Sequence, residues 1–131
     1  MSMNDTITDA LTKIRNAEAA SQKECVIKPA SKFLGEILKV AKDNEYIAGY
    51  EVLEMTGGVL EVKVNLNGKM NICKGIKPRY AVKKDGYEKY EKRYLPARDV
   101  GLIVVSTSKG LMTHAQAKRE GLGGRLVAFM Y

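Results

Sequence analysis

The sequence predicts an α/β (α+β) fold of two small domains. We expect an N-terminal α-β-α-β-β-type unit over residues 1–74, and a C-terminal unit over residues 75–131 that is mainly antiparallel β with one short helix. Apolar residues recur at helical spacing in two segments of the first half, and later segments show apolar runs or strict alternation between glycine-containing turns. A chain of 131 residues has room for one domain or two small ones.

The first domain begins with two amphipathic helices separated by a short strand. Asn4 or Asp5 can cap the first helix, and its apolar stripe consists of Ile7, Ala10, Leu11 and Ile14. A strand over 25–27 ends at Pro29, and Ser31 caps the second helix. The inward positions of that helix are Leu34, Ile37, Leu38 and Ala41.

Strands follow over residues 47–54 and 59–66, joined by Gly57-Gly58. Asn67-Gly68 is a strong signal for a tight hairpin, so residues 69–73 are expected to pair back antiparallel. In the second domain, Gly86 interrupts a lysine- and tyrosine-rich segment that is either a loop or a frayed helix. Further strands are expected at 100–105 and 126–131.

Thr113 and Gln116 form a capping-box pattern that starts a short helix, which Gly121 ends. The glycines from Gly121 to Gly124 follow this helix instead of opening one, so they do not form a phosphate-binding loop. We expect a helix C-cap and then a bulge or a close backbone approach at the start of the last strand.

The composition excludes several classes of function. Cys25 and Cys73 have no C-x-x-C pattern and are expected to be buried free thiols, and His114 has no ligand cluster and is expected on a helix surface. We therefore expect neither a metal nor a cofactor. No apolar run approaches the ~20 residues that span a bilayer, and the first residues do not resemble a signal peptide. These features predict a cytoplasmic protein with no membrane partner.

Charge is divided unevenly along the chain. Residues 1–66 hold eight Lys/Arg against ten Asp/Glu, a net charge of −2, whereas residues 67–131 hold fourteen against five, a net charge of +9. Between residues 74 and 98, nine basic residues are interleaved with four tyrosines: Tyr80, Tyr87, Tyr90 and Tyr94. This pattern favours binding to nucleic acid, since cations neutralise phosphates and tyrosine rings stack on bases. The alternative is a solvated loop whose tyrosines pack into the core.

A hydroxyl-rich segment, Ser106-Thr107-Ser108-Lys109-Gly110, follows the apolar strand. Its hydroxyls suit the wide, shallow minor groove of double-stranded RNA, where they can bond to ribose 2′-hydroxyls, with the lysine on a phosphate. The competing interpretation is a serine acyl-transfer enzyme, because Ser106 and Lys109 match S-x-x-K. The partner motifs S-D-N and K-T-G are absent, which weighs against this enzyme.

Over nearly its whole length the chain resembles the universal small-subunit ribosomal protein number eight. The most specific part is residues 101–110 (GLIVVSTSKG), followed by Met112-Thr113 and by residues 121–124. Residues 4–16 and 28–32 resemble the opening helix and the strand-to-helix turn of the family. Residues 86–99 resemble its archaeal-type branch.

The resemblance implies a structural constituent of the small ribosomal subunit, a primary binder of a helix in the central domain of small-subunit rRNA that supports its assembly. The implied partners are that rRNA and neighbouring small-subunit ribosomal proteins, and the free protein is expected to be a monomer and not an enzyme. Some relatives also repress their own messenger RNA, and that function remains an alternative. Tyr90 is the candidate aromatic contact, although Tyr87 or Tyr94 could serve. The other implied RNA-binding residues are Asp5, Thr6, Asn16, Lys28, Ser31, Lys32, Arg93, Ser106, Thr107, Ser108, Lys109, Gly110, Gly124 and Arg125.

Overall fold

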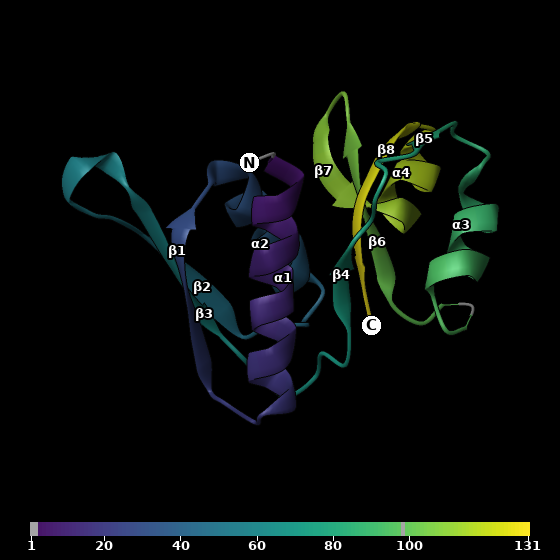
Figure 1. Cartoon of the computed structure of the whole chain (residues 1–131). Coiled ribbons are helices and arrows are strands. Elements are labelled where there is room, and N and C mark those ends of the chain that lie inside the picture. Colours follow the sequence, from purple (N-terminus) through teal and green to yellow (C-terminus); the bar gives the residue numbers. More distant parts are fainter. Residues whose placement is uncertain (1–2, 98) are drawn as a thin grey trace. The chain divides into compact units, whose positions relative to one another are not determined.

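The computed structural model describes residues 3–97 and 99–131, with side chains from residue 6 onward. It contains both helices and antiparallel sheets, which confirms the α+β fold class. The chain divides into two compact units, Met1–Asn71 and Ile72–Tyr131. The arrangement within each unit can be followed in Figure 1.

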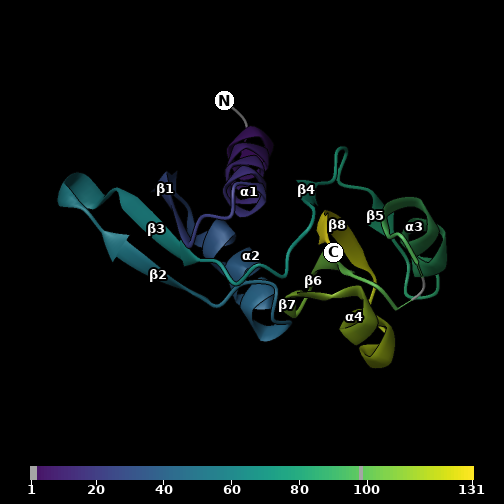
Figure 2. The ribbon, with the colours of Figure 1, turned by 90° about the horizontal axis from the view of Figure 1, so that it is seen from below.

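Unit 1 is a three-stranded antiparallel sheet with two helices against one face. Its elements are α1 (Met3–Ala19), β1 (Glu24–Ala30), α2 (Lys32–Asp43), β2 (Gly49–Glu54), the 3-10 turn η1 (Thr56–Gly58) and β3 (Leu60–Asn65). The strand order is β1-β3-β2, so β3 is central. Paired residues on the helix-facing side, such as Ile27 with Val62 and Cys25 with Val64, are buried. Figure 2 shows β2, η1 and β3 continuing as a ribbon beyond the part of the sheet that the helices cover.

The predicted caps of unit 1 are partly testable. Ser31 caps α2 as expected, because its hydroxyl accepts a hydrogen bond from the Leu34 N–H at 3.2 Å. Asn4 and Asp5 fall within α1, and their side chains lie outside the described residues.

The strand predicted at residues 69–73 is wrong. Both edges of β3 are already occupied, by β1 and by β2, so β3 has no free edge for a third partner. The Asn67 side chain accepts from the Lys69 N–H at 3.1 Å and donates to the Glu45 carbonyl at 3.0 Å, which turns the chain away from the sheet. Only residues from Cys73 onward form a strand, and that strand pairs within unit 2.

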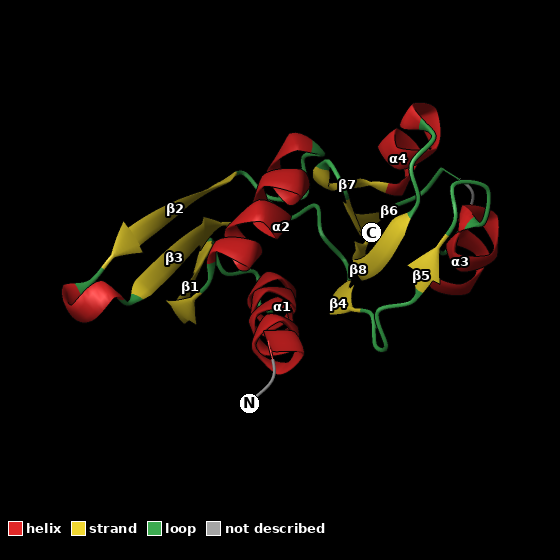
Figure 3. Cartoon of the chain, turned by 90° about the horizontal axis from the view of Figure 1, so that it is seen from above, coloured by secondary structure: helices red, strands yellow, loops and turns green. Residues whose placement is uncertain are grey.

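Unit 2 is an antiparallel sheet with two helices against one face. Figure 3 shows these helices in red and the strands in yellow. Its elements are β4 (Cys73–Gly75), β5 (Ala81–Val82), α3 (Tyr87–Tyr94), β6 (Leu102–Thr107), β7 (Gly110–Thr113), α4 (His114–Glu120) and β8 (Gly124–Met130). The strand order is β4-β8-β6-β7, and β5 also pairs with β8. Its core includes Ile103, Val105, Met112, Leu126 and Phe129.

Unit 2 contains two helices, one more than the single short helix predicted, because the segment predicted as a loop or a frayed helix is helical. The lysine- and tyrosine-rich segment forms α3 because Tyr87, Tyr90 and Tyr94 follow helical spacing and pack against one core. Tyr87 is 1% exposed, and its hydroxyl donates to the Leu122 carbonyl at 2.8 Å. When tyrosines are the residues that repeat at helical spacing, the amphipathic pattern is hard to distinguish from a polar loop.

The position predicted for His114 is also wrong. His114 is the first residue of α4, is 8% exposed, and its Nδ1 accepts a hydrogen bond from the Ile103 N–H at 3.0 Å. Its side chain therefore packs beneath α4 and not on the outer surface of the helix. Other local predictions are confirmed: Thr113 caps α4, Gly121 ends it in the left-handed region at φ 68°, and both cysteines are buried and form no disulfide.

Candidate nucleic-acid interface

The hydroxyl-rich segment is the tip of the β6–β7 hairpin. Thr107 pairs with Gly110, so Ser108 and Lys109 form a two-residue loop. Gly110 has φ +104°, a backbone conformation that side chains with a Cβ rarely adopt, and a Cβ here would meet nothing within 4 Å. Glycine is therefore required by the backbone of this turn and not by crowding.

The three hydroxyls have different roles. Thr107 Oγ1 donates to the Gly110 carbonyl at 2.8 Å and accepts from the Lys109 N–H at 3.1 Å, so it braces the turn. Ser106 and Ser108 make no hydrogen bond through their side chains to other described residues. Ser108 is exposed and Ser106 is half-buried. Two of the three predicted hydroxyls are thus available to an external partner.

Ser106 lies in a row that crosses the sheet. It pairs with Leu111 on β7 and with Arg125 on β8, so Ser106 and Arg125 project from the same face. Gly124 lies so close to the Ser106 carbonyl that a Cβ would overlap it, and the same Cβ would lie 2.9 Å from Val105 Cγ1. The close backbone approach predicted for the glycines before β8 is confirmed.

Two cations lie near the free serines. Lys109 is in the loop, where its Nζ is 4.0 Å from Glu120 Oε1 and its side chain is 66% exposed. An exposed pair at that distance contributes little, so the lysine charge stays available to an anion. Arg125 is exposed beside Ser106. Free hydroxyls between positive charges match the donors and acceptors of a sugar-phosphate backbone.

A second group, of aromatic and basic side chains, belongs to α3. The rings of Tyr80 and Tyr90 are 5.5 Å apart, and the Arg93 guanidinium lies 5.2 Å from the Tyr80 ring centroid and 5.3 Å from that of Tyr94. Figures 1 and 3 place α3 and the hairpin at different ends of unit 2, with β8 and α4 between them. The structure therefore does not bring Tyr90 or Arg93 next to the serine loop. Tyr90 remains half-buried, whereas Tyr87 is in the core and cannot stack on a base.

A partly buried electrostatic cluster connects α3 to α4, and no pattern in the sequence predicts it. Glu91 on α3 forms an ion pair with Lys118 and lies 3.3 Å from His114 Nε2. Because Nδ1 of His114 is an acceptor, Nε2 carries the proton and donates toward Glu91. Burial lowers the pKa of His114, and the nearby Glu91 carboxylate opposes that shift only in part.

The predicted residues of unit 1 form two separate groups. Figure 1 shows the end of β1, the start of α2 and the start of α1 toward one end of the unit. These segments contain four of the predicted residues: Lys28, Ser31, Lys32 and Thr6. Asn16 is ten residues further along α1, ~15 Å away by helical rise. The hydroxyl of Ser31 is used by its cap. Asp5 lies in α1 with its side chain outside the described residues.

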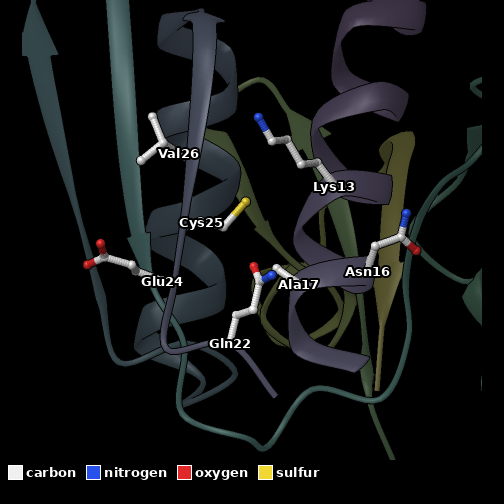
Figure 4. Close-up of a pocket in the computed structure, with 7 residues that line it drawn as sticks. All are labelled: Lys13, Asn16, Ala17, Gln22, Glu24, Cys25 and Val26. Carbon is white, nitrogen blue, oxygen red and sulfur yellow. The ribbon is translucent and has the colours of Figure 1, made fainter. Parts of the chain in front are cut away.

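Asn16 instead lines an open recess of about 350 Å³ between α1 and β1 (Figure 4). The lining residues are Lys13, Asn16, Ala17, Gln22, Glu24, Cys25 and Val26. Burial raises the pKa of the Cys25 thiol, and Lys13 offsets this only in part, so Cys25 is held as a neutral thiol. The recess offers no activated nucleophile.

Catalytic and metal chemistry find little support in the described part of the chain. Ser106 and Lys109 share no hydrogen bond there, and Lys109 is directed to Glu120, so the pair lacks the geometry of an activated nucleophile. No group of three His, Cys, Asp or Glu side chains among residues 3–97 and 99–131 is placed to hold a metal ion. Within the same residues, no helix has the length and apolar character needed to cross a membrane.

Among the described residues, the basic unit 2 presents the Ser106 and Ser108 hydroxyls beside Lys109 and Arg125, an arrangement suited to a protein that binds RNA. The family model described as Ribosomal protein S8 matches residues 5–131, and the chain belongs to this family. It is a ribosomal protein that binds rRNA, in a structural and not an enzymatic family. Its partners are rRNA and other ribosomal proteins, and it is associated with the ribosome.

Proposed function

We propose that this protein is a primary binder of a helix in the central domain of small-subunit rRNA and supports the folding of that domain during assembly. The β6–β7 hairpin enters the minor groove of the helix. Ser106 and Ser108 exchange hydrogen bonds with ribose 2′-hydroxyls and base edges, while Lys109 and Arg125 contact phosphates. Thr107 and Gly110 set the shape of the turn and do not read the RNA.

The observation that carries this proposal is that the three hydroxyls of the hairpin differ in their hydrogen bonding. The Thr107 hydroxyl is hydrogen-bonded within the turn, whereas the hydroxyls of the serines on either side of it have no hydrogen bond to another described residue. A turn of fixed shape loses little conformational entropy on binding, so its free hydroxyls contribute more of their bonding energy to affinity. The net charge of +9 over residues 67–131 supplies the attraction to a polyanion.

Further contacts extend the proposal to the rest of the chain. Thr6, Lys28 and Lys32 lie toward one end of unit 1 and form a second contact to the same rRNA. Tyr90 and Arg93 belong to α3, at another end of unit 2 from the hairpin, and contact a separate stretch of the same rRNA. We propose that the free protein is a monomer of the archaeal-type branch, and the resemblance of residues 86–99 to that branch supports the second part of this proposal.

Salt dependence tests the phosphate contacts. In a titration with the isolated central-domain helix, Lys109→Ala should reduce the slope of log affinity against log salt by about one unit. Lys42→Ala is the matched control, because Lys42 is an exposed lysine on α2 outside the proposed contacts. Equal slopes for the two variants would show that Lys109 does not contact a phosphate.

The choice of RNA tests the assembly role against repression. The proposal requires the rRNA helix to bind more tightly than any segment of the protein's own messenger RNA at the same salt concentration. Tighter binding to the messenger would instead favour the repressor function.

A further inference from the structure

The β2–β3 ribbon, residues 49–65, carries most of the exposed large hydrophobic residues of the described chain. Five large hydrophobic residues are exposed among the described residues, and three belong to this ribbon: Val52 at 48%, Leu53 at 44% and Met55 at 38%. They follow one another along β2 and into the turn. Figure 2 shows this part of the ribbon reaching beyond α1 and α2. Among its described residues, no element of unit 1 buries these side chains.

The same segment has the opposite charge to the rest of the protein. Residues 49–61 contain Glu51, Glu54 and Glu61 and no lysine or arginine, a net charge of −3 in a chain of +7. None of these three carboxylates forms an ion pair with another described residue. Lys63, directly across from Glu51, pairs instead with Glu24 on β1 at 3.1 Å. An acidic surface with unpaired charges repels RNA and attracts a cationic partner.

β2 is also an open edge. It pairs with β3 on one side only. The Met55 N–H donates to the Val59 carbonyl at 2.7 Å, which fixes the alternation of the antiparallel ladder. The residues that bond to β3 are therefore Glu51 and Leu53, while the main-chain groups of Tyr50, Val52 and Glu54 face the open side. An exposed edge with apolar side chains on both faces is a template for another strand.

We propose that β2 is a docking edge for an extended, basic segment of another ribosomal protein, which adds as a fourth strand to the sheet of unit 1. Main-chain hydrogen bonds to Tyr50, Val52 and Glu54 supply affinity. Alternate side chains of the partner contact Val52 on one face and Leu53 on the other, and its lysines or arginines pair with Glu51, Glu54 and Glu61. RNA is excluded from this surface by the three carboxylates.

Photocrosslinking in purified small ribosomal subunits tests the proposal. The chain carries p-benzoylphenylalanine in place of Leu53, and the cross-linked product is sequenced by mass spectrometry. The expected product is a peptide of another ribosomal protein with an excess of lysine and arginine. A product with RNA only, a product with a second copy of this chain, or no product would overturn the proposal.

Two further substitutions in the cross-linking chain test separately the charge complementarity and the main-chain hydrogen bonding of the docking edge. Glu54→Lys should lower the cross-link yield by roughly tenfold or more, because a lysine placed against the basic residues of the partner weakens binding by at least that factor. Glu36→Lys, the same charge change on the exposed face of α2, should leave the yield unchanged. Val52→Pro removes a main-chain donor on the open side only and should abolish the cross-link. Amide exchange in β3 that matches the unsubstituted chain shows that the ribbon stays folded.

Equal yields for Glu54→Lys and Glu36→Lys would contradict the charge complementarity, and an unchanged yield in a folded Val52→Pro chain would contradict strand addition. These results are separable from the rRNA proposal. Binding of the isolated Val52→Pro protein to the rRNA helix should match that of the unsubstituted protein, because the hairpin of unit 2 is untouched.

Discussion

Gly124 packs against the backbone of Ser106, so a substitution at this position affects both the packing of unit 2 and the proposed RNA contact. Replacing it by alanine adds one methyl group that would overlap the Ser106 carbonyl oxygen and lie 2.9 Å from Val105 Cγ1 and 3.0 Å from the Ser106 carbonyl carbon. Two of these three atoms are backbone of β6, which pairs with β7 on one side and β8 on the other and cannot withdraw. Gly124→Ala is therefore expected to cost about 1–3 kcal/mol of overpacking.

Thermal unfolding measures this cost. For a domain of 60–100 residues, each kcal/mol shifts the midpoint by about 4–8 °C, so a fall of roughly 4–24 °C is expected. Gly35→Ala is the matched control. Gly35 lies in α2, has no positive φ, and a Cβ there meets nothing within 4 Å. Alanine should stabilise the helix by about 0.5–1 kcal/mol.

The two variants should therefore move the midpoint in opposite directions. A Gly124→Ala protein as stable as the unsubstituted chain would refute the reasoning, since it would mean that β6 and β8 can separate at no cost. The same substitution should weaken RNA binding, because any relaxation moves Ser106.

Two further predictions concern buried groups of unit 2. Because burial lowers the pKa of His114 below 6.5, the unfolded chain binds this proton before the folded chain does. The free energy of unfolding should be fully retained above pH ~6.5 and fall as the pH is lowered through and below that value. Denaturant unfolding at a series of pH values checks this, and His114→Asn should flatten that part of the profile. Tyr87→Phe removes the hydrogen bond to the Leu122 carbonyl and should cost about 0.5–1.5 kcal/mol in the same assay without changing the circular dichroism spectrum. An unchanged unfolding free energy would mean that the hydroxyl contributes nothing.

Local signals in the sequence predicted much of the fold. Ser31, Thr113 and Gly121 define helix ends because capping depends on residues three or four positions away. The glycines before β8 were expected to permit a close backbone approach, and Gly124 does. These features need no knowledge of which strands are neighbours.

The errors arose where the outcome depends on sheet order. Residues 69–73 follow a strong turn signal, but pairing back onto β3 requires a free edge, and β1 has taken it from a distant part of the sequence. His114 was expected on the helix surface because no ligand cluster accompanies it in the sequence, yet the packing of α4 over β6 buries it against the Ile103 N–H. No periodicity within the helix contains that information.

The candidate site follows the same division. The residues of the hairpin were predicted together because they are contiguous in sequence. The proximity of Arg125 to Ser106 depends on the register between β6 and β8, which the sequence does not reveal. The different use of the Thr107 hydroxyl became evident only from the turn geometry.

The hairpin's role is tested most directly by a double substitution combined with a change in the RNA. Ser106→Ala with Ser108→Ala removes both free hydroxyls and should weaken binding to the central-domain helix by about 1–3 kcal/mol, roughly a 5- to 150-fold rise in Kd. The salt slope should stay the same, and Thr12→Ala on α1 should have no effect. With 2′-deoxy sugars in the contacted groove, the difference in Kd between the double variant and the unsubstituted protein should shrink, because only the bonds to base edges remain.

That smaller difference would show that the serines act in part through ribose hydroxyls. If the double variant, folded to the same thermal midpoint, binds the all-ribose helix with an unchanged Kd, the hairpin does not read the RNA, and the account of its function is wrong.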